Sequence, residues 1–263
     1  MVINGDPVKV RQRMLSSAKI VDLLVELLAC PVDGVPDEGN LTPIFLAAYD
    51  VIHTYMRGCK KNCLYFAKNI TFLQQQLTLK PEISLSVVRL IVELIRDNRK
   101  VVDRISPNQI DWFVALLRKT KNYRFLELLN VLCVCDGVGI PANQNCIVQK
   151  WLNKDKEDVY LIQRGQFISL ESNLNYVSMN GGRTWTPLHT FLNPISPDYS
   201  ESKCQFLHAQ LDLFANLCYG HNSFAMRQIT HEYEILTWDQ AMFCLRSEIL
   251  PADLRAKYCR LIT

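Results

Sequence analysis

The sequence lacks a hydrophobic run long enough to cross a membrane, and it lacks a strong net charge. Nowhere in its 263 residues is there an apolar stretch of the roughly 18 residues that a membrane-spanning helix needs. Even Ile20 to Ala29 is interrupted by Asp22 and Glu26. Because the segment Met1 to Val10 has no apolar h-region, we expect no secretory signal. The formal charge of +3 is too small to favour nucleic acid as a partner. Since there is also no long apolar stretch, we expect neither nucleic acid nor membrane contact for this chain.

Recognisable catalytic and metal-binding motifs are also missing. The histidines never fall at HExxH or HxH spacing, no serine lies in a Gly-x-Ser-x-Gly elbow, and Gly181-Gly182 lacks the Gly-Lys-Ser ending of a phosphate-binding loop. The cysteines offer only Cys59-x3-Cys63 and Cys133-x-Cys135, which are poor spacings for zinc. We therefore predict no catalytic residue, no metal and no cofactor, and we expect that the chain is not an enzyme. Five cysteines occur in apolar helical contexts and are expected to behave as small hydrophobes in a reducing compartment: Cys30, Cys133, Cys218, Cys244 and Cys259.

What the sequence does contain is helical periodicity. Hydrophobic residues make up 49% and charged residues 21%, a globular composition that can bury a sizeable core. Apolar residues at helical spacing and helix start signals predict a series of helices: Val8–Ala29, Thr42–Arg57 with Gly58 as its stop, one from Cys59, one from Pro81, one from Ser106-Pro107, Phe125–Cys135, Lys203–Tyr219, Ser223–His231, Thr237–Arg246 and one after Pro251. Helix pairs recur at roughly 35 to 45 residues, which predicts a mainly α fold, an armadillo/HEAT-like helical solenoid. Five residues are placed in its core: Leu132, Cys133, Leu211, Phe214 and Leu217.

Two stretches interrupt the helical pattern. Residues 30–39 contain several prolines and glycines and are expected to form a loop. Between residues 151 and 202 the periodicity weakens, and short strands or extended segments are expected at Val159–Ile162, Gln166–Leu170 and Tyr176–Met179. The predicted organisation is therefore a helical domain over residues 1–150, a small extended or β insert over 151–202, and a continuing solenoid segment over 203–263.

Basic residues cluster at the starts of two predicted helices. Lys9, Arg11 and Arg13 occur near the start of the first helix, where Lys9 and Arg13 share a face at a spacing of four. Lys60 and Lys61 open a later helix. Two such clusters can hold phosphate groups through charge-assisted hydrogen bonds. The alternative is that they are solvated helix ends, which is the usual fate of charged runs.

Several segments resemble the helical homology domain shared by inositol trisphosphate receptors and ryanodine receptors. The resemblance lies in Asn62–Asn69, Leu132–Val138, Gln210–Cys218 and Leu250–Leu261, in that order. In ryanodine receptors a much longer insertion of additional domains follows the helical block, whereas here the segment 151–202 is short. The chain is therefore more similar to inositol trisphosphate receptors, and the resemblance implies the helical half of a ligand-binding core and the next part of a cytosolic solenoid.

The resemblance also implies a set of ligand residues. The family's first arm reads Arg-x-Arg-x-Lys-x-x-Arg, and this chain has Lys9, Arg11 and Arg13 at the first three positions but Ser16 at the last. The second arm, Tyr-Arg-Lys-Asn in the family, reads Cys59-Lys60-Lys61-Asn62 here. Because lysine and serine lack the forked donor of arginine, we expect inositol trisphosphate binding to be weak or lost. The implied ligand residues are Lys9, Arg11, Arg13, Lys60 and Lys61.

The function implied by the resemblance is that of a cytosolic fragment of an intracellular ligand-gated calcium-release channel. It would couple movement of the ligand cleft to the pore, contact other domains of the same channel, and stand on the cytosolic face of the endoplasmic reticulum as part of a homotetramer. The alternative is a free-standing helical-repeat adaptor that binds a protein partner on its concave face. Membrane-spanning stretches downstream in the full-length transcript would distinguish the channel from the adaptor.

Overall fold

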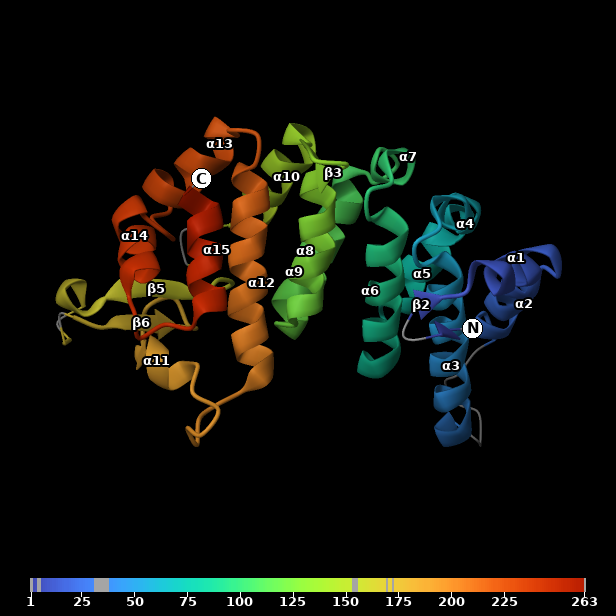
Figure 1. The fold of residues 1–263 in the computed structure, drawn as a ribbon, viewed down its shortest axis with the longest axis horizontal. Coiled ribbons are helices and arrows are strands. Elements are labelled where there is room, and N and C mark those ends of the chain that lie inside the picture. The colour runs from blue at the N-terminus through green and yellow to red at the C-terminus, as the bar shows by residue number, and fades with distance from the viewer. Residues whose placement is uncertain are drawn as a thin grey trace. The chain divides into compact units, whose positions relative to one another are not determined.

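The computed structural model describes residues 2–3, 6–30, 38–152, 156–168, 170–171 and 173–262. The chain divides into two compact units, residues 1–104 and residues 105–263. Helices make up most of both units (Figure 1), and a small sheet lies in the second. The predicted class, a mainly α-helical solenoid with a small β insert, is confirmed.

The first unit begins with a short antiparallel strand pair and continues as helices. Its elements are β1 (Val2–Ile3), β2 (Asp6–Pro7), α1 (Lys9–Ser17), α2 (Ile20–Leu28), α3 (Glu38–Met56), α4 (Lys60–Phe66), η1 (Ala67–Asn69), α5 (Ile70–Gln76), α6 (Pro81–Ile95) and α7 (Arg99–Val102). Helices α3 and α6 pack side by side and form the centre of this unit (Figure 1). The apolar face predicted for the helix from Pro81 is fully buried in α6, because Ile83, Val87 and Ile91 are all inaccessible to solvent.

The single helix predicted over Val8–Ala29 is wrong. The structure has two helices there, α1 and α2, separated at Lys19, whose φ of 52° is left-handed. The turn uses Ala18 and Lys19, whose N–H groups donate to the carbonyls of Met14 and Ser16. Since a lysine rarely adopts this conformation and no glycine or proline marks the position, no local sequence pattern indicates the break.

The start of α3 also differs from expectation. The helix begins at Glu38 and not at Thr42, and Pro43 lies inside it. Pro43 lies in the second turn of the helix, where it removes one backbone hydrogen bond to the residue four positions earlier. The loop expected over residues 30–39 falls mainly on residues 31–37, which lie outside the described residues. The predicted stop at Gly58 is confirmed, since α3 ends at Met56 and Gly58 has a φ of 68°.

The second unit contains the remaining helices and the sheet. Its elements are α8 (Pro107–Thr120), α9 (Tyr123–Cys133), β3 (Val134–Cys135), β4 (Val138–Gly139), α10 (Pro141–Trp151), β5 (Leu161–Arg164), η2 (Gly165–Phe167), β6 (Asn175–Ser178), β7 (Thr186–Pro187), α11 (Leu188–Phe191), α12 (Glu201–Cys218), α13 (Ser223–Arg227), η3 (Gln228–Glu232), α14 (Trp238–Arg246) and α15 (Ala252–Ile262). The predicted start signal at Ser106 is a full capping box, in which Ser106 and Gln109 each bond the other's backbone N–H.

The core of the second unit lies between α9 and α12, which run side by side (Figure 1). On α12, the ring of Phe214 packs 5.6 Å from the ring of Trp151 at the end of α10. The core prediction is confirmed, since every residue placed there is buried: Leu132, Cys133, Leu211, Phe214 and Leu217.

The sheet of the second unit is antiparallel, with strand order β5-β6-β7. It accounts for the strands predicted near Val159–Ile162 and Tyr176–Met179, with shifts of one or two residues. The strand predicted at Gln166–Leu170 is wrong, because the 3-10 turn η2 occupies its start. There the N–H of Leu170 donates to the carbonyl of Gly165 at 2.9 Å. A Cβ at Gly165 would lie only 1.9 Å from the backbone oxygen of Glu171, so this tight fold requires glycine.

All ten cysteines are free thiols. Cys133 and Cys244 are buried, and burial raises the pKa of the Cys244 thiol to about 12. Cys30 and Cys259 are exposed, so for these two the expected burial in an apolar helical context is wrong. Cys30 lies beyond the end of α2 at Leu28, so it is not part of that helix. Cys259 lies in the last turn of α15 on an exposed side, and the apolar spacing of the sequence does not specify which side faces the core.

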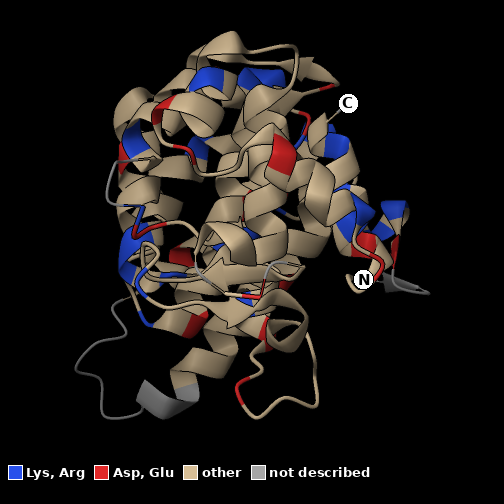
Figure 2. Cartoon of the chain, turned by 90° about the vertical axis from the view of Figure 1, so that its left-hand side faces the viewer, with Lys and Arg blue, Asp and Glu red and all other residues tan. Residues whose placement is uncertain are grey.

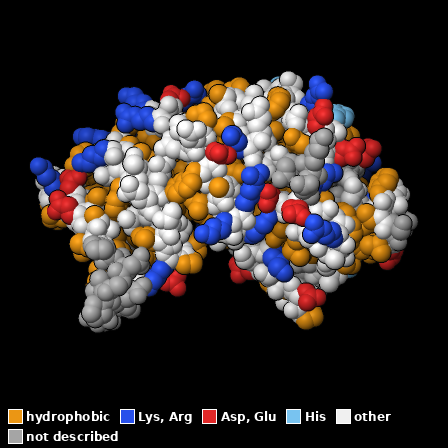
Figure 3. Space-filling view, turned by 180° about the vertical axis from the view of Figure 1, so that it is seen from behind, with side chains coloured by type: hydrophobic (Ala, Val, Ile, Leu, Met, Phe, Trp, Pro, Cys, Tyr) orange, Lys and Arg blue, Asp and Glu red, His pale blue; other side chains and the backbone are white. Residues whose placement is uncertain are grey.

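The surface carries both signs of charge. Basic and acidic residues are interspersed on the side drawn in Figure 2, and Figure 3 shows charged side chains of both signs between hydrophobic patches. No helix within the described ranges is long and apolar enough to cross a membrane.

Candidate functional site

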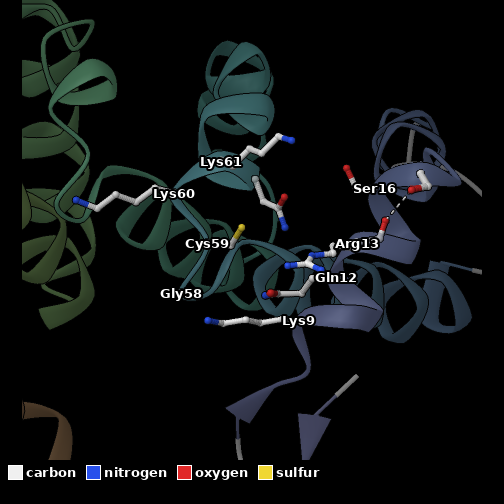
Figure 4. Close-up of a pocket in the computed structure, with 10 residues that line it drawn as sticks. Lys9, Gln12, Arg13, Ser16, Gly58, Cys59, Lys60 and Lys61 are labelled. Carbon is white, nitrogen blue, oxygen red and sulfur yellow. Dashed lines mark hydrogen bonds between the residues drawn. The ribbon is translucent and has the colours of Figure 1, made fainter.

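A basic cavity of about 660 Å³ lies in the first unit, between α1 and the turn that joins α3 to α4. Helix α1, the α3–α4 turn and the first turn of α4 together contribute its ten lining residues: Lys9, Gln12, Arg13, Ser16, Ser17, Gly58, Cys59, Lys60, Lys61 and Asn62. Four of these residues are cationic and none is acidic. Figure 4 shows Arg13 and Gln12 side by side on α1, with Cys59 and Lys61 across from them. A cavity lined in this way attracts anions and offers several separate donors to one ligand.

Four of the five predicted ligand residues line this cavity. Lys9 and Arg13 come from one face of α1, while Lys60 and Lys61 form the first turn of α4. Arg11 is exposed and is not among the lining residues, because a spacing of two turns its side chain to another side of the helix than Lys9. In Figure 4 the Lys60 side chain extends away from Arg13, so the cations surround the cavity rather than meeting at one point.

Below the cavity, the last carbonyl groups of α3 are hydrogen-bonded by residues from both of its walls. From α1, the Gln12 amide nitrogen donates to the carbonyls of Thr54 at 2.9 Å and Arg57 at 3.0 Å. From α4, the Asn62 amide nitrogen donates to the carbonyl of Tyr55 at 2.8 Å. Because helix C-termini leave their last carbonyls without helical partners, these side chains supply hydrogen-bond donors that α3 itself does not.

Further contacts fix the turn itself. The Cys59 N–H donates to the Met56 carbonyl at 2.9 Å, and the Cys63 thiol also points at that carbonyl at 3.5 Å. Burial raises the pKa of the Cys63 thiol to about 12, so it stays neutral. The Gly58 N–H donates to the Glu93 carboxylate of α6 at 3.2 Å. The wall of the cavity contributed by Cys59–Asn62 is therefore held by both α3 and α6.

A separate cluster connects α2 to α4 beside the cavity. The Tyr65 hydroxyl donates to Asp22 at 2.5 Å, and the Lys68 ammonium donates to the same carboxylate at 2.9 Å. The Lys68 nitrogen also lies 4.3 Å from the centre of the Tyr65 ring. The hydrogen bond from Tyr65, assisted by that from Lys68, lowers the pKa of Asp22 below its ordinary value.

The cavity lining also includes three residues that were not predicted as ligand residues: Gln12, Ser17 and Asn62. Gln12 and Asn62 are buried polar side chains, and their partners are backbone carbonyls more than 40 residues and 7 residues away. For Gln12 the contact is tertiary, so no local pattern marks it. For Asn62 a signal existed, since an asparagine shortly after a glycine helix stop is well placed to bond the preceding helix end.

Comparison with known proteins places this site in a family. The RIH domain model matches residues 1–163, which include the whole cavity. The chain is 20% identical over 258 residues to inositol 1,4,5-trisphosphate receptor-like protein A of Dictyostelium discoideum, covering 98% of this chain and 8% of that protein. It is 22% identical over 296 residues to the inositol 1,4,5-trisphosphate receptor itr-1 of Caenorhabditis elegans, covering 98% of this chain and 10% of that protein. The chain thus spans about a tenth or less of the length of these relatives.

A solved structure supports the fold. The crystal structure of an engineered protein, a Northeast Structural Genomics Consortium target, superposes with a TM-score of 0.59 over 95% of this chain and 81% of its own, at 15% sequence identity. That likeness concerns the fold alone. Together with the family match over residues 1–163, the relatives show that the chain belongs to the RIH domain family of inositol trisphosphate and ryanodine receptors, on the inositol trisphosphate receptor side.

Proposed function

We propose that this chain is part of an intracellular ligand-gated calcium-release channel and that its basic cavity forms one side of an inositol phosphate-binding cleft. The observation that carries the proposal is that four cationic residues and no acidic residue line one cavity: Lys9, Arg13, Lys60 and Lys61. The names of the two relatives, both inositol 1,4,5-trisphosphate receptors or receptor-like, agree with it. In this role the chain stands on the cytosolic face of the endoplasmic reticulum, within a homotetramer, and contacts other domains of the same channel.

The coupling role follows from how the cavity is built. Both walls of the cavity are bonded to the C-terminal end of α3, and the α3–α4 turn is bonded to Glu93 of α6. A ligand that draws the two walls together would therefore pull on α3 and α6, the two helices at the centre of the unit. Movement of the cleft would pass into the packed helices in this way, because packed elements shift as units.

Binding by this chain alone is expected to be weak. Lysines replace the forked arginine donors, and Ser16 stands where a further cation would complete the first wall. We expect an affinity for inositol trisphosphate weaker than about 1 μM even at low salt, falling further as salt screens the cations.

Titration calorimetry with inositol trisphosphate at low salt tests the site, and the chain offers a matched pair of variants. Arg13→Ala removes a cation that lines the cavity, whereas Arg11→Ala removes the same charge two residues away and outside it. We expect Arg13→Ala and Lys60→Ala to weaken binding and Arg11→Ala to leave it nearly unchanged. Equal losses in Arg13→Ala and Arg11→Ala would mean that net charge, and not the cavity, attracts the ligand.

A further inference from the structure

Helix α1 carries half of the basic cavity but has little apolar anchoring of its own. Among its residues only Gln12 is buried, with 4% of its surface exposed. Its apolar side chains Val10 and Met14 are 63% and 65% exposed. A helix of nine residues is too short to be stable by itself in water, so its position depends on tertiary contacts.

The buried amide of Gln12 supplies such a tertiary contact at the C-terminal end of α3. Its two hydrogen bonds reach the carbonyls of Thr54 and Arg57, and Arg57 directly precedes Gly58, where the opposite wall of the cavity begins. Gln12 is also the direct neighbour of Arg13. One side chain therefore joins a cation-bearing helix to the base of the turn that leads into α4, where Lys60 and Lys61 lie.

From this geometry we propose that Gln12 is a positioning residue that sets the spacing between the cations of α1 and those at the start of α4. It thereby fits the cavity to ligands that carry at least two phosphate groups, one for each wall. The proposal rests on the proposed function of the cavity as an inositol phosphate site. A ligand with a single phosphate gains nothing from this spacing, because it can bind either wall alone.

The second unit also contains a buried glutamine that donates to two carbonyls at a helix end, and this residue does not line the basic cavity. Gln144 is fully buried, and its amide nitrogen donates to the carbonyls of Asn216 at 2.8 Å and Tyr219 at 3.0 Å, at the end of α12. These carbonyls have the same three-residue spacing as those that Gln12 contacts. In each case a glycine with positive φ follows the second carbonyl: Gly58 at 68° and Gly220 at 76°. The Gln144 amide oxygen also accepts from the Asn222 side chain at 2.9 Å. Gln144 is therefore a stringent control, because its loss removes the same pair of hydrogen bonds and one more without touching the cavity.

The test compares Gln12→Met with Gln144→Met in two measurements. Methionine keeps the length of glutamine but cannot donate to a carbonyl. In hydrogen exchange, Gln12→Met should speed exchange of the α1 amides about tenfold or more, the equivalent of 1.4 kcal/mol, while α6 amides keep their protection. In titration at low salt, it should weaken inositol trisphosphate binding about tenfold and leave inorganic phosphate binding unchanged. Gln144→Met should change neither the α1 amides nor either affinity.

Unchanged α1 exchange in Gln12→Met would overturn the proposal, as would equal losses of trisphosphate affinity in the two variants or an equal loss for inorganic phosphate. If Gln12→Met also speeds exchange of the α6 amides, Gln12→Asn is used in its place. The asparagine side chain is one methylene shorter, so its amide cannot reach both carbonyls. It should therefore change α1 exchange and trisphosphate affinity in the same direction by smaller factors. Should the unaltered protein bind trisphosphate no better than inorganic phosphate, the proposed function of the cavity fails. The α1 exchange still decides then whether Gln12 fixes the helix.

Discussion

The side chain of Gln210 and the backbone of Tyr160 are hydrogen-bonded in both directions. The Tyr160 N–H donates to the Gln210 amide oxygen at 2.7 Å, and the Gln210 amide nitrogen donates to the Tyr160 carbonyl at 2.7 Å. Gln210 is buried on α12, and Tyr160 directly precedes β5. The amide thus occupies the position of a neighbouring strand and fastens the sheet of the insert to the core helix.

Gln210→Leu should therefore destabilise the second unit. The leucine leaves both backbone groups of Tyr160 without this partner, and an unsatisfied buried polar group costs roughly 1 to 3 kcal/mol. Denaturant unfolding followed by tryptophan fluorescence measures the change, since Trp151 is buried in this unit. Gln205→Leu on the same helix, where the amide bonds only the neighbouring turn at Glu201, is the control and should change stability much less. Equal effects of the two substitutions would show that the paired amide adds nothing specific.

Phe214→Ala should cost roughly 3 to 5 kcal/mol of unfolding free energy, because it removes a fully buried ring that packs on Trp151 and leaves a cavity. Phe167→Ala is the comparison, since that ring is 66% exposed and its truncation should change stability little. The denaturation midpoint reports both. An unchanged midpoint for Phe214→Ala would contradict its place in the core.

How far the sequence predicted this protein depends on the range of the interactions involved. Helix α6 was predictable because its burial follows a local period, and the start of α8 because the Ser106 signal is local. The cationic lining residues were also recognised, since charge is visible in the sequence. The break at Lys19 was not, because a non-glycine residue takes a left-handed conformation there and the packing of the turn decides it.

The supporting contacts of the cavity were hidden for the same reason. Gln12 and Thr54 are separated by 42 residues, and nothing near Gln12 in the sequence indicates a buried amide. Arg11 was included among the predicted ligand residues because it matches the spacing of the family's basic residues. Which side of α1 faces the cavity depends on how this helix packs against α3, and Arg11 lies on another side. The sequence therefore identified which residues carry charge, whereas the tertiary structure decides which of those charges face one cavity.

Acid should weaken the attachment of α2 to α4. The hydrogen bonds from Tyr65 and Lys68 lower the folded-state pKa of Asp22 below its ordinary value of 3.8. A lowered folded-state pKa adds stability that is fully present above pH 3.8 and is lost as the pH falls through the folded-state value. The difference in stability between the unaltered protein and Asp22→Asn should therefore be constant from neutral pH to about pH 5 and shrink below pH 4. A difference that grows as the pH falls would contradict the assignment.

Ser16→Arg should strengthen binding of inositol trisphosphate. Ser16 is exposed and lines the basic cavity on the same helix as Lys9 and Arg13, so an arginine there adds a forked, permanently charged donor to that wall. A hydrogen bond to a charged group contributes roughly 1.5 to 3 kcal/mol, which corresponds to a gain of about tenfold to a hundredfold in affinity.

The control for this gain is Met14→Arg, which adds the same charge to α1 at a position that is 65% exposed and outside the cavity lining. Calorimetry at low and at physiological salt separates the two effects, because a general increase in positive charge is screened while a forked contact inside the cavity is screened less. We expect the Ser16→Arg gain to persist at physiological salt and the small Met14→Arg gain to vanish. Equal gains that disappear together would mean that the cavity attracts the ligand by net charge alone and that position 16 does not face a bound phosphate.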